Sequence, residues 1–293
     1  MGPVGNPDRE TLEPGLYLIA TPIGAARDIT LRALDILRAA DVLAAEDTRS
    51  LRRLMGIHGI ALGGRPLISH HDHSGASARA RILAELAAGR SVVYAAEAGT
   101  PMISDPGFDL ARAALAAGHR LISAPGPSAV LGALTLSGLP AERFFFVGFL
   151  PPTQARRRAA LAELAAVPAT LIFYESPRRV AAMLAEAAAC LGADRPAALC
   201  RELTKKFEEV WRGPLGELAE RAAAQPLRGE IVVLIGAPER DSENVSEIAL
   251  DRELRTELAR QSLRDAADTV SARLGLRRRD VYQRAVALAK GRK

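Results

Sequence analysis

Six short polar segments of this chain each follow an apolar run, and their side chains are of types that bind ligands and move protons. They are residues 21–24 (TPIG), 45–49 (AEDTR), 97–101 (EAGTP), 125–129 (PGPSA), 173–176 (FYES) and 201–205 (RELTK). If the apolar runs are parallel strands, the segments meet at the carboxyl edge of the sheet, where open α/β sheets bind ligands. A single Thr-Pro or Pro-Gly pair is typical of an ordinary turn, but six such segments together predict a binding site.

The sequence lacks the motifs of several common enzyme classes. No GxGxxG follows the first apolar run, and neither GxxxxGK[ST] nor GxSxG occurs. A Rossmann dinucleotide site, a P-loop and a serine-hydrolase elbow are therefore disfavoured. The spacing of His70, His71 and His73 could hold a metal, but nothing else in the sequence clusters like a zinc site. We expect a solvated or hydrogen-bonding loop there, and no metal.

Short apolar runs alternate with stretches of helical periodicity, and these elements must position the polar segments. Strands are predicted at 16–20, 42–45, 91–95 and 120–124, and helices at 28–40, 79–88 and 108–117. This alternation is typical of a mainly parallel sheet with helices on both faces. After Pro140, a second α/β domain with more strands is predicted. Its strands lie at 144–149, 170–174, 197–201 and 229–236, and its helix at 154–166 carries a basic patch at 156–158.

The fold class is therefore α/β, with two domains and a small helical C-terminal appendage. We expect a flexible tail over residues 1–14, α/β domains over 15–126 and 127–237, and a polar linker over 238–247. The basic appendage covers 248–293. Within it, helices are predicted at 251–274 and 278–290, separated by Gly275 and Leu276.

The composition is that of an ordinary globular protein with a basic charge. The chain has 293 residues, of which 48% are hydrophobic and 25% charged, and its net charge is +5. It has no apolar stretch of about 20 residues and no signal-peptide pattern. With Cys190 and Cys200 as its only cysteines, it is expected in the cytoplasm. Its Arg richness reflects either codon usage or an anionic partner such as nucleic acid.

In this order, the segments resemble the tetrapyrrole methylase superfamily, and within it the branch that methylates small-subunit ribosomal RNA. The motifs are TPIGAARDITLRALDILRAADVLAAEDTR at 21–49, AGTPMISDPG at 98–107, PGPSAVLGALTLSGLP at 125–140, TLIFYESPRR at 170–179 and RELTKKFEE at 201–209. The resemblance implies two α/β domains with the cofactor cleft between them, and a homodimer that needs no metal. It also implies methyl transfer from S-adenosyl-L-methionine to the ribose 2′-hydroxyl of a cytidine in the decoding region of 16S rRNA.

The resemblance further implies which residues hold the methyl donor. One loop departs from the family pattern, because Ala96 and Glu97 stand where the family has Ser and Asp, which makes the carboxylate one methylene longer. The implied cofactor-binding residues are Pro22, Ala98, Gly99, Thr100, Ile103, Ser128, Ala129, Phe149, Leu150, Glu175, Leu203, Glu230 and Ile231.

Methyl transfer to a hydroxyl needs in-line positioning and a group that accepts the proton of a weak nucleophile. The candidate proton acceptors are Glu46, Asp47, Glu97, Glu175 and Glu202, with His71 less favoured, and direct loss of the proton to water is the alternative. Lys205 or Arg201 could instead lower the pKa of the hydroxyl or bind a phosphate. A local ion pair is the competing explanation for the charged residues of the AEDTR and RELTK segments. The main catalytic candidates are Glu46, Asp47, Glu97, Glu202 and Lys205.

Basic side chains are the candidate contacts for RNA phosphates, because such contacts dominate nucleic-acid affinity. Residues 277–293 hold seven basic residues against one Asp, so the appendage is predicted either to dock RNA or to brace a dimer. A methyltransferase acting on a tetrapyrrole or another small molecule, and a non-catalytic RNA-binding protein, remain as alternative functions. The candidate RNA-binding residues are Arg49, Arg201, Arg277, Arg278 and Arg279.

Overall fold

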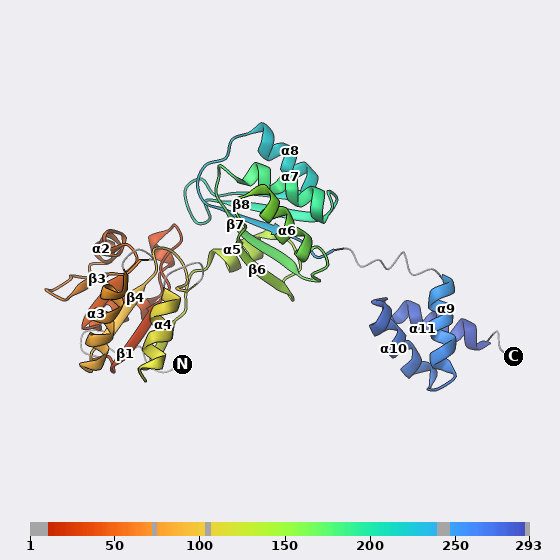
Figure 1. Cartoon of the computed structure of the whole chain (residues 1–293), viewed down its shortest axis with the longest axis horizontal. Coiled ribbons are helices and arrows are strands. Elements are labelled where there is room, and N and C mark those ends of the chain that lie inside the picture. The colour runs from red at the N-terminus through yellow and green to blue at the C-terminus, as the bar shows by residue number, and fades with distance from the viewer. Residues whose placement is uncertain (1–10, 72–74, 103–106, 239–246, 291–293) are drawn as a thin grey trace. The chain divides into compact units, whose positions relative to one another are not determined.

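The computed structural model describes residues 11–71, 75–102, 107–238 and 247–290. The chain divides into two compact units, Met1–Gly236 and Ala237–Lys293 (Figure 1). The first unit contains two β-sheets, each with its own helices. We call these two parts the first lobe and the second lobe.

The first lobe is a parallel sheet covered by helices on both faces. Its strands are β1 (Gly15–Ile19), β2 (Val42–Ala45), β3 (Leu67–Ser69), β4 (Ser91–Ala95) and β5 (Leu121–Ala124). Its helices are η1 (Ala26–Asp28), α1 (Leu31–Ala39), α2 (Thr48–Ile57), α3 (Gly75–Ala87) and α4 (Gly107–Ala116). The strand order is β3-β2-β4-β1-β5, with every pairing parallel. Along β1, Tyr17 and Ile19 pack with α1 and α2, whereas Leu16 and Leu18 pack with α3 and α4. The predicted fold of this lobe is confirmed.

The second lobe is a mixed sheet, also with helices on both faces. Its strands are β6 (Phe144–Phe149), β7 (Thr170–Glu175), β8 (Pro196–Arg201), β9 (Glu209–Pro214) and β10 (Ile231–Ile235). Its helices are α5 (Ala129–Ser137), α6 (Gln154–Leu164), α7 (Val180–Leu191) and α8 (Leu215–Ala224). The order is β6-β7-β10-β8-β9, in which β6 and β7 are parallel and the other pairs antiparallel.

Two features of the second sheet correct the sequence prediction. Each sheet has five strands within the described residues, so the second lobe does not have more. The six polar segments also lie at the edges of two sheets instead of one. Because β10 is antiparallel to both neighbours, its first residue, Ile231, pairs with Glu175 at the end of β7 and with Arg201 at the end of β8. The start of β10 therefore joins the FYES and RELTK segments at one edge.

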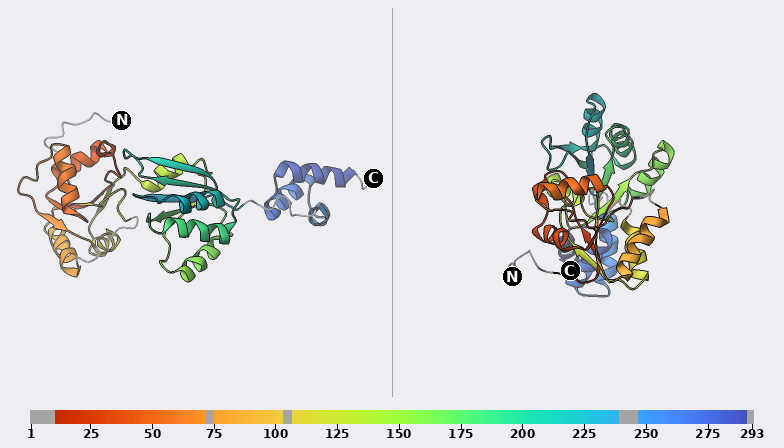
Figure 2. Two further views of the ribbon diagram at one scale, coloured as in Figure 1. Left: turned by 90° about the horizontal axis from the view of Figure 1, so that it is seen from above. Right: turned by 90° about the vertical axis from the view of Figure 1, so that its left-hand side faces the viewer.

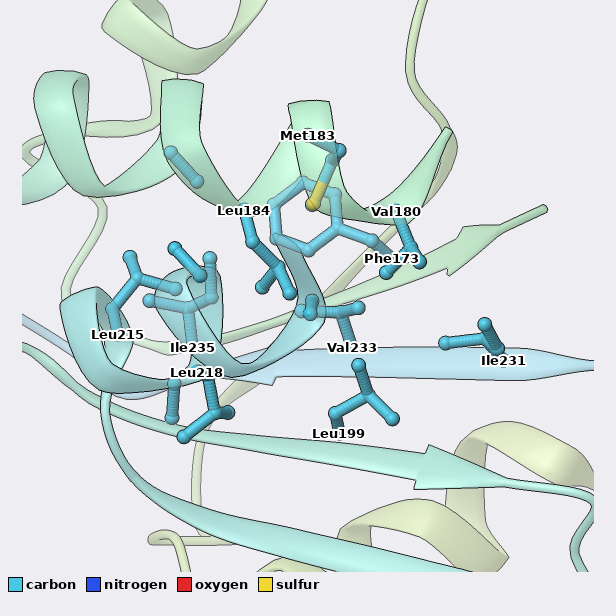
Figure 3. Close-up of a cluster of buried hydrophobic side chains, with 14 of the residues drawn as sticks. Phe173, Val180, Met183, Leu184, Leu199, Leu215, Leu218, Ile231, Val233 and Ile235 are labelled. Carbon is cyan, nitrogen blue, oxygen red and sulfur yellow. The ribbon is translucent and has the colours of Figure 1, made fainter. Parts of the chain in front are cut away.

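A continuous apolar core holds the second sheet against α6, α7 and α8. Phe173 and Val233 of the sheet share this core with Val180, Met183 and Leu184 of α7 (Figure 3). Phe173 and Met183 are fully buried, and burial of such a side chain stabilises the fold by about 1.5–3 kcal/mol. The opposite face of the sheet is covered by α5.

A buried ion pair joins α6 to α7. The Nη2 atom of Arg157 lies 2.7 Å from Oε1 of Glu186, and the two side chains are 7% and 11% exposed. Hydrogen bonds from the Arg157 guanidinium hold the pKa of the Glu186 carboxyl below its ordinary value. Arg157 therefore does not belong to the basic surface patch that the sequence predicts at 156–158.

Three helices pack around a small apolar core in the described part of the C-terminal unit (Figures 1 and 2). They are α9 (Glu247–Leu258), α10 (Leu263–Leu274) and α11 (Arg278–Lys290). The prediction of one helix over 251–274 is wrong, because the chain turns at 259–262 and the Ser262 hydroxyl caps α10 by accepting the Asp265 N–H. The predicted break after α10 is confirmed, and Gly275 there has the left-handed φ of 67° that favours glycine.

Candidate functional site

A cavity of about 600 Å³ lies within the unit Met1–Gly236, with residues of both lobes in its wall. The first-lobe strands β1, β2, β4 and β5 deliver one part of this wall through the segments that follow them. The second lobe delivers the rest from the ends of β6 and β7, the RELTK segment and the start of β10. The lining residues are Ile23, Glu46, Ser50, Glu97, Ala98, Gly99, Thr100, Ser128, Ala129, Phe149, Tyr174, Glu175, Ser176, Pro177, Leu203, Gly229, Glu230, Ile231 and Val232.

The EAGTP segment forms a turn that three neighbouring segments hold in place. Thr21 and Gly99 exchange backbone hydrogen bonds of 2.9 and 3.0 Å. The Thr100 hydroxyl donates to the Pro127 carbonyl at 3.0 Å, and the Glu97 N–H donates to Glu46 Oε2 at 3.3 Å. The loops after β1, β2 and β5 thus fix the backbone of this turn, which gives the pocket a preorganised floor.

Gly99 is required at this turn for two reasons. Its φ of 78° lies in the left-handed region, and an added Cβ would approach Ile23 Cγ2 to 3.3 Å. The absence of a side chain leaves the backbone accessible to a ligand in the pocket.

The FYES segment builds a rigid wall at the end of β7. The Glu175 side chain is 1% exposed, and its Oε2 lies 3.1 Å from Nη2 of Arg179. The same Arg179 atom donates to the Leu150 carbonyl at 2.6 Å. This network ties the ends of β6 and β7 together, so Glu175 is an ion-paired part of the wall.

An aromatic pair closes the same side of the pocket. Phe149 packs edge-on against Tyr174 with 5.7 Å between the ring centroids, and Phe149 remains 57% exposed. Burial raises the pKa of the Tyr174 hydroxyl, so Tyr174 acts as a neutral apolar and hydrogen-bonding surface at physiological pH.

The structure places most of the predicted donor-binding residues in the pocket wall, with three exceptions. Pro22 is adjacent to the lining residue Ile23 but does not line the cavity. Leu150 is buried in the core of the second lobe instead of lining the cavity. Ile103 lies outside the described residues.

The predicted catalytic residues separate into two groups. Glu46 and Glu97 line the pocket, whereas Asp47, Glu202 and Lys205 do not. Asp47 instead caps α2 by accepting the Arg49 N–H at 2.8 Å. Hydrogen bonds from the side chain and backbone of Arg49 lower the pKa of Asp47. The ion pair expected between residues 46 and 49 is thus formed by Asp47 and Arg49, at 3.2 Å.

Sequence reasoning missed several lining residues, although most adjoin residues that it named. Ser50 was missed for a different reason: it lies in the first turn of α2, a helix that the apolar runs did not predict. A Thr-Arg-Ser run after the capping Asp47 was the available signal. The missed residues are Ile23, Ser50, Tyr174, Ser176, Pro177, Gly229 and Val232.

The candidate RNA-binding arginines differ in how much of their charge is already paired. The Arg49 side chain is 90% exposed beside the pocket, in spite of its contact with Asp47. The Nη2 atom of Arg201 lies 2.9 Å from Oε2 of Glu209, and Arg278 is ion-paired with Asp268. Their neighbours Arg277 and Arg279 are exposed and have no ion-pair partner among the residues that the structure describes.

The described residues contain no cluster of three or more His, Cys, Asp or Glu side chains arranged to hold a metal. His70 is buried edge-on against Tyr94, His71 is exposed, and His73 lies outside the described residues. Each described helix is too short or too polar to span a lipid bilayer.

This pocket is large enough for a small organic ligand and places acidic side chains next to it. It combines a preorganised backbone turn, an aromatic wall and the carboxylates of Glu46 and Glu97. These groups can orient two reactants and accept a proton.

Known proteins are similar to this chain in sequence. The family of tetrapyrrole (corrin/porphyrin) methylases matches residues 15–219, and the RsmI C-terminal HTH domain family matches residues 244–289. The chain is 46% identical to ribosomal RNA small subunit methyltransferase I of Mesorhizobium japonicum, over 94% of this chain and 93% of that protein. It is 42% identical to the protein of the same name from Pseudomonas aeruginosa, over 92% and 96% of the two chains.

Solved structures are similar to this chain in fold. Cobalt precorrin-4 methyltransferase, CbiF, matches with a TM-score of 0.59 at 17% identity, over 75% of this chain and 94% of that one. Uroporphyrin-III C-methyltransferase from Thermus thermophilus, in complex with S-adenyl homocysteine, matches with a TM-score of 0.54 at 21% identity, over 76% and 97%. At these identities the likeness shows the fold alone.

Proposed function

This chain belongs to the ribosomal RNA small subunit methyltransferase I family of the tetrapyrrole methylases, and we propose from this premise that it methylates the ribose 2′-hydroxyl of a cytidine in the decoding region of small-subunit rRNA. The methyl donor is S-adenosyl-L-methionine. The observation that carries the proposal is the shared pocket, which motif segments of both lobes line. The relatives at 42–46% identity act on ribosomal RNA by name, which favours rRNA over a small-molecule substrate.

The pocket fits the donor in size and in the chemistry of its wall. The 98–100 turn offers backbone groups at a glycine with no side chain in the way, and Phe149, Tyr174 and Ile231 offer apolar surface. Ser128, which caps α5, and Ala129, its first residue, place the positive end of that helix at the cavity. We assign the donor to this wall, with Leu203 and Glu230 closing it from the second lobe.

When bound, S-adenosyl-L-methionine would supply a methyl group that its sulfonium activates for transfer to the hydroxyl oxygen. The protein must orient the hydroxyl and accept its proton. Glu97 is the best-placed group, because its carboxylate makes no hydrogen bond or ion pair with the described residues. Glu46 positions it by accepting the Glu97 N–H. We therefore assign the proton-accepting role to Glu97.

We further propose that the protein acts as a homodimer in the cytoplasm. One of the two edge strands of the second sheet, β6, exposes Phe144 and Phe145 at 42% and 48%. An edge strand with exposed aromatic side chains is typical of an interaction surface. Sedimentation equilibrium of the wild type and of a Phe144→Ser, Phe145→Ser variant tests this. A dimer that the variant converts to monomer supports the proposal, and a monomeric wild type contradicts it.

The decisive experiment for the reaction uses small ribosomal subunits from a strain that lacks this gene. The purified protein is incubated with these subunits and methyl-labelled donor, and the label is mapped by nuclease digestion and mass spectrometry. A single 2′-O-methylcytidine in the decoding region is the expected result. The matched inactive control is Thr100→Arg, which fills the pocket beside Gly99. Absence of label in spite of donor binding would favour a small-molecule substrate.

A further inference from the structure

The loop formed by residues 202–205 has an unusual backbone. Glu202 and Thr204 have φ values of 52° and 61°, in the left-handed region that non-glycine residues seldom adopt. Such a conformation costs conformational energy and persists only where the surroundings hold it. Leu203, between the two, lines the pocket. The contacts that hold this loop therefore also set part of the pocket wall.

A charged network fixes the loop to the start of β10. Glu202 Oε1 accepts the Glu230 N–H at 3.0 Å and a hydrogen bond from Lys205 Nζ at 3.0 Å. Lys205 Nζ also lies 3.1 Å from Glu230 Oε2. The ion pair expected between Glu202 and Lys205 is thus confirmed, and Glu230 extends it to the pocket wall.

Gly229 makes room for this network. A Cβ at Gly229 would lie 2.5 Å from Cδ of Glu202, and the residue has a φ of 86°. Any side chain there would displace Glu202 and strain the backbone. The Glu202 carboxylate is therefore built into the turn that precedes β10.

The same loop touches the first lobe. The Thr204 hydroxyl accepts the Ala25 N–H at 3.0 Å. A Cβ at Gly24 would lie 2.6 Å from Cγ of Lys205 and from Oγ1 of Thr204. The TPIG segment therefore lies directly against the loop, next to Ile23 of the pocket wall. The loop thus joins wall segments of both lobes.

We propose that Glu202 and Lys205 are positioning residues for the methyl donor, and that the 202–205 loop holds the two lobes closed around it. The inference rests on the proposed function. Neither side chain lines the cavity, so neither is placed to exchange a proton with the hydroxyl. They act through Leu203, Glu230 and Thr204. Neutralising the ammonium would leave two carboxylates facing each other and loosen the wall.

Lys205→Met tests this, with Lys206→Met as the matched control. Lys206 is the next residue, is exposed, and contacts the Phe207 ring instead of a carboxylate. The readouts are the affinity for S-adenosylhomocysteine by calorimetry, steady-state kinetics on small subunits, and the pH–rate profile. We expect Lys205→Met to weaken product affinity and raise the donor KM about tenfold. The kcat at saturating donor and the pH profile stay as in the wild type, and Lys206→Met changes none of these.

Thr204 provides a second test that leaves the charged network intact. Thr204→Val removes the acceptor for the Ala25 N–H and is expected to weaken donor affinity. Thr204→Ser keeps the hydroxyl, so its donor affinity should match that of the wild type. If Lys205→Met does not fold, the comparison of these two variants tests whether the loop positions the donor.

Two results would overturn the inference. If Lys205→Met lowered kcat and altered the pH profile with product affinity unchanged, Lys205 would be catalytic. If the folded variants bound S-adenosylhomocysteine as the wild type does, the loop would not position the donor. A wild type that binds no S-adenosylhomocysteine would instead refute the donor assignment itself, and the inference with it.

Discussion

Glu97 is the carboxylate of the pocket wall to which we assign the proton-accepting role. The pocket wall also holds the carboxylates of Glu46, Glu175 and Glu230, but each of these has a partner: the Glu97 N–H, Arg179 and Lys205 respectively. The Glu97 carboxylate has no such partner among the described residues, which is why we assign the proton-accepting role to it.

Replacing this carboxylate tests the assignment. Glu97→Gln is expected to lower the single-turnover methylation rate about 100-fold, because an amide cannot accept the proton. Affinity for S-adenosylhomocysteine stays unchanged. Glu97→Asp restores the family residue and serves as the control, with activity near that of the wild type. If the Glu97→Gln variant methylated at the wild-type rate, we would conclude that the hydroxyl proton is lost directly to water.

At single residues, the sequence predicted the pocket wall better than the roles of charged side chains. The segment that contains Gly99 and Thr100 was identifiable from its place after a strand, and the resemblance to the family implied these two residues. The capping role of Asp47 and the burial of Leu150 were not, because both depend on where α2 and the second core lie. Motif position predicts proximity to a ligand, but burial and pairing are decided by tertiary packing.

At the scale of elements, the contact between α6 and α7 depends on the buried Arg157–Glu186 pair. Glu186→Gln leaves the Arg157 charge without its partner, and we expect a loss of about 3 kcal/mol in the free energy of unfolding at pH 7. Glu163→Gln, at an exposed position of the same α6, is the control and is expected to be neutral. Urea unfolding measures both.

The lowered pKa of Glu186 gives this effect a pH dependence of known sign. The pair's contribution is fully present above the ordinary glutamate pKa of about 4.3, and it is lost as the pH falls through the lower folded-state pKa. The stability gap between wild type and Glu186→Gln should therefore narrow towards pH 3. A gap independent of pH would show that the carboxylate charge does not stabilise this contact.

The helix α2 connects the pocket to a basic surface. Ser50 lines the pocket, while Arg52 and Arg53 on the same helix are exposed and have no ion-pair partner among the described residues. We expect a double change of Arg52 and Arg53 to Gln to weaken rRNA binding and to reduce the slope of log affinity against log salt by about 1.5. Arg38→Gln is the control, because Arg38 is already paired with Asp35. An unchanged salt slope would exclude α2 from the RNA interface.

The bounds of helices were predicted correctly where polar caps and apolar runs coincide. The prediction was wrong where the two signals conflict. The first helix begins at Leu31, three residues later than predicted, because the Thr30 side chain caps it and residues 26–28 form a 3₁₀ turn. In the C-terminal unit, periodicity runs through 251–274, but Ser262 offers a competing cap and divides the helix. Local capping outweighed periodicity in both cases.

At the scale of the whole molecule, the strand order was not predictable from the sequence. The alternation of strand and helix predicts parallel pairing, which holds for the first sheet. In the second, β10 enters between β7 and β8 in the opposite direction. That reversal brings Gly229 and Glu230 to the pocket, so the site depends on a long-range pairing that no local pattern encodes.

The division of the chain into two compact units leads to the last prediction. Because the pocket lies wholly within Met1–Gly236, a chain that ends at residue 244 should bind S-adenosylhomocysteine as the full chain does. Its rRNA affinity should fall and its salt slope become shallower, since the exposed charges of Arg277 and Arg279 are lost.

In the full chain, Arg279→Gln should reproduce part of this loss of rRNA affinity. Arg278→Gln should reproduce less of it, because Arg278 is paired with Asp268. Filter binding over a salt series measures the rRNA affinity of each variant. Sedimentation equilibrium tests the alternative role of the C-terminal unit. If the shortened chain kept its RNA affinity but formed a weaker dimer, the unit would be a dimer brace.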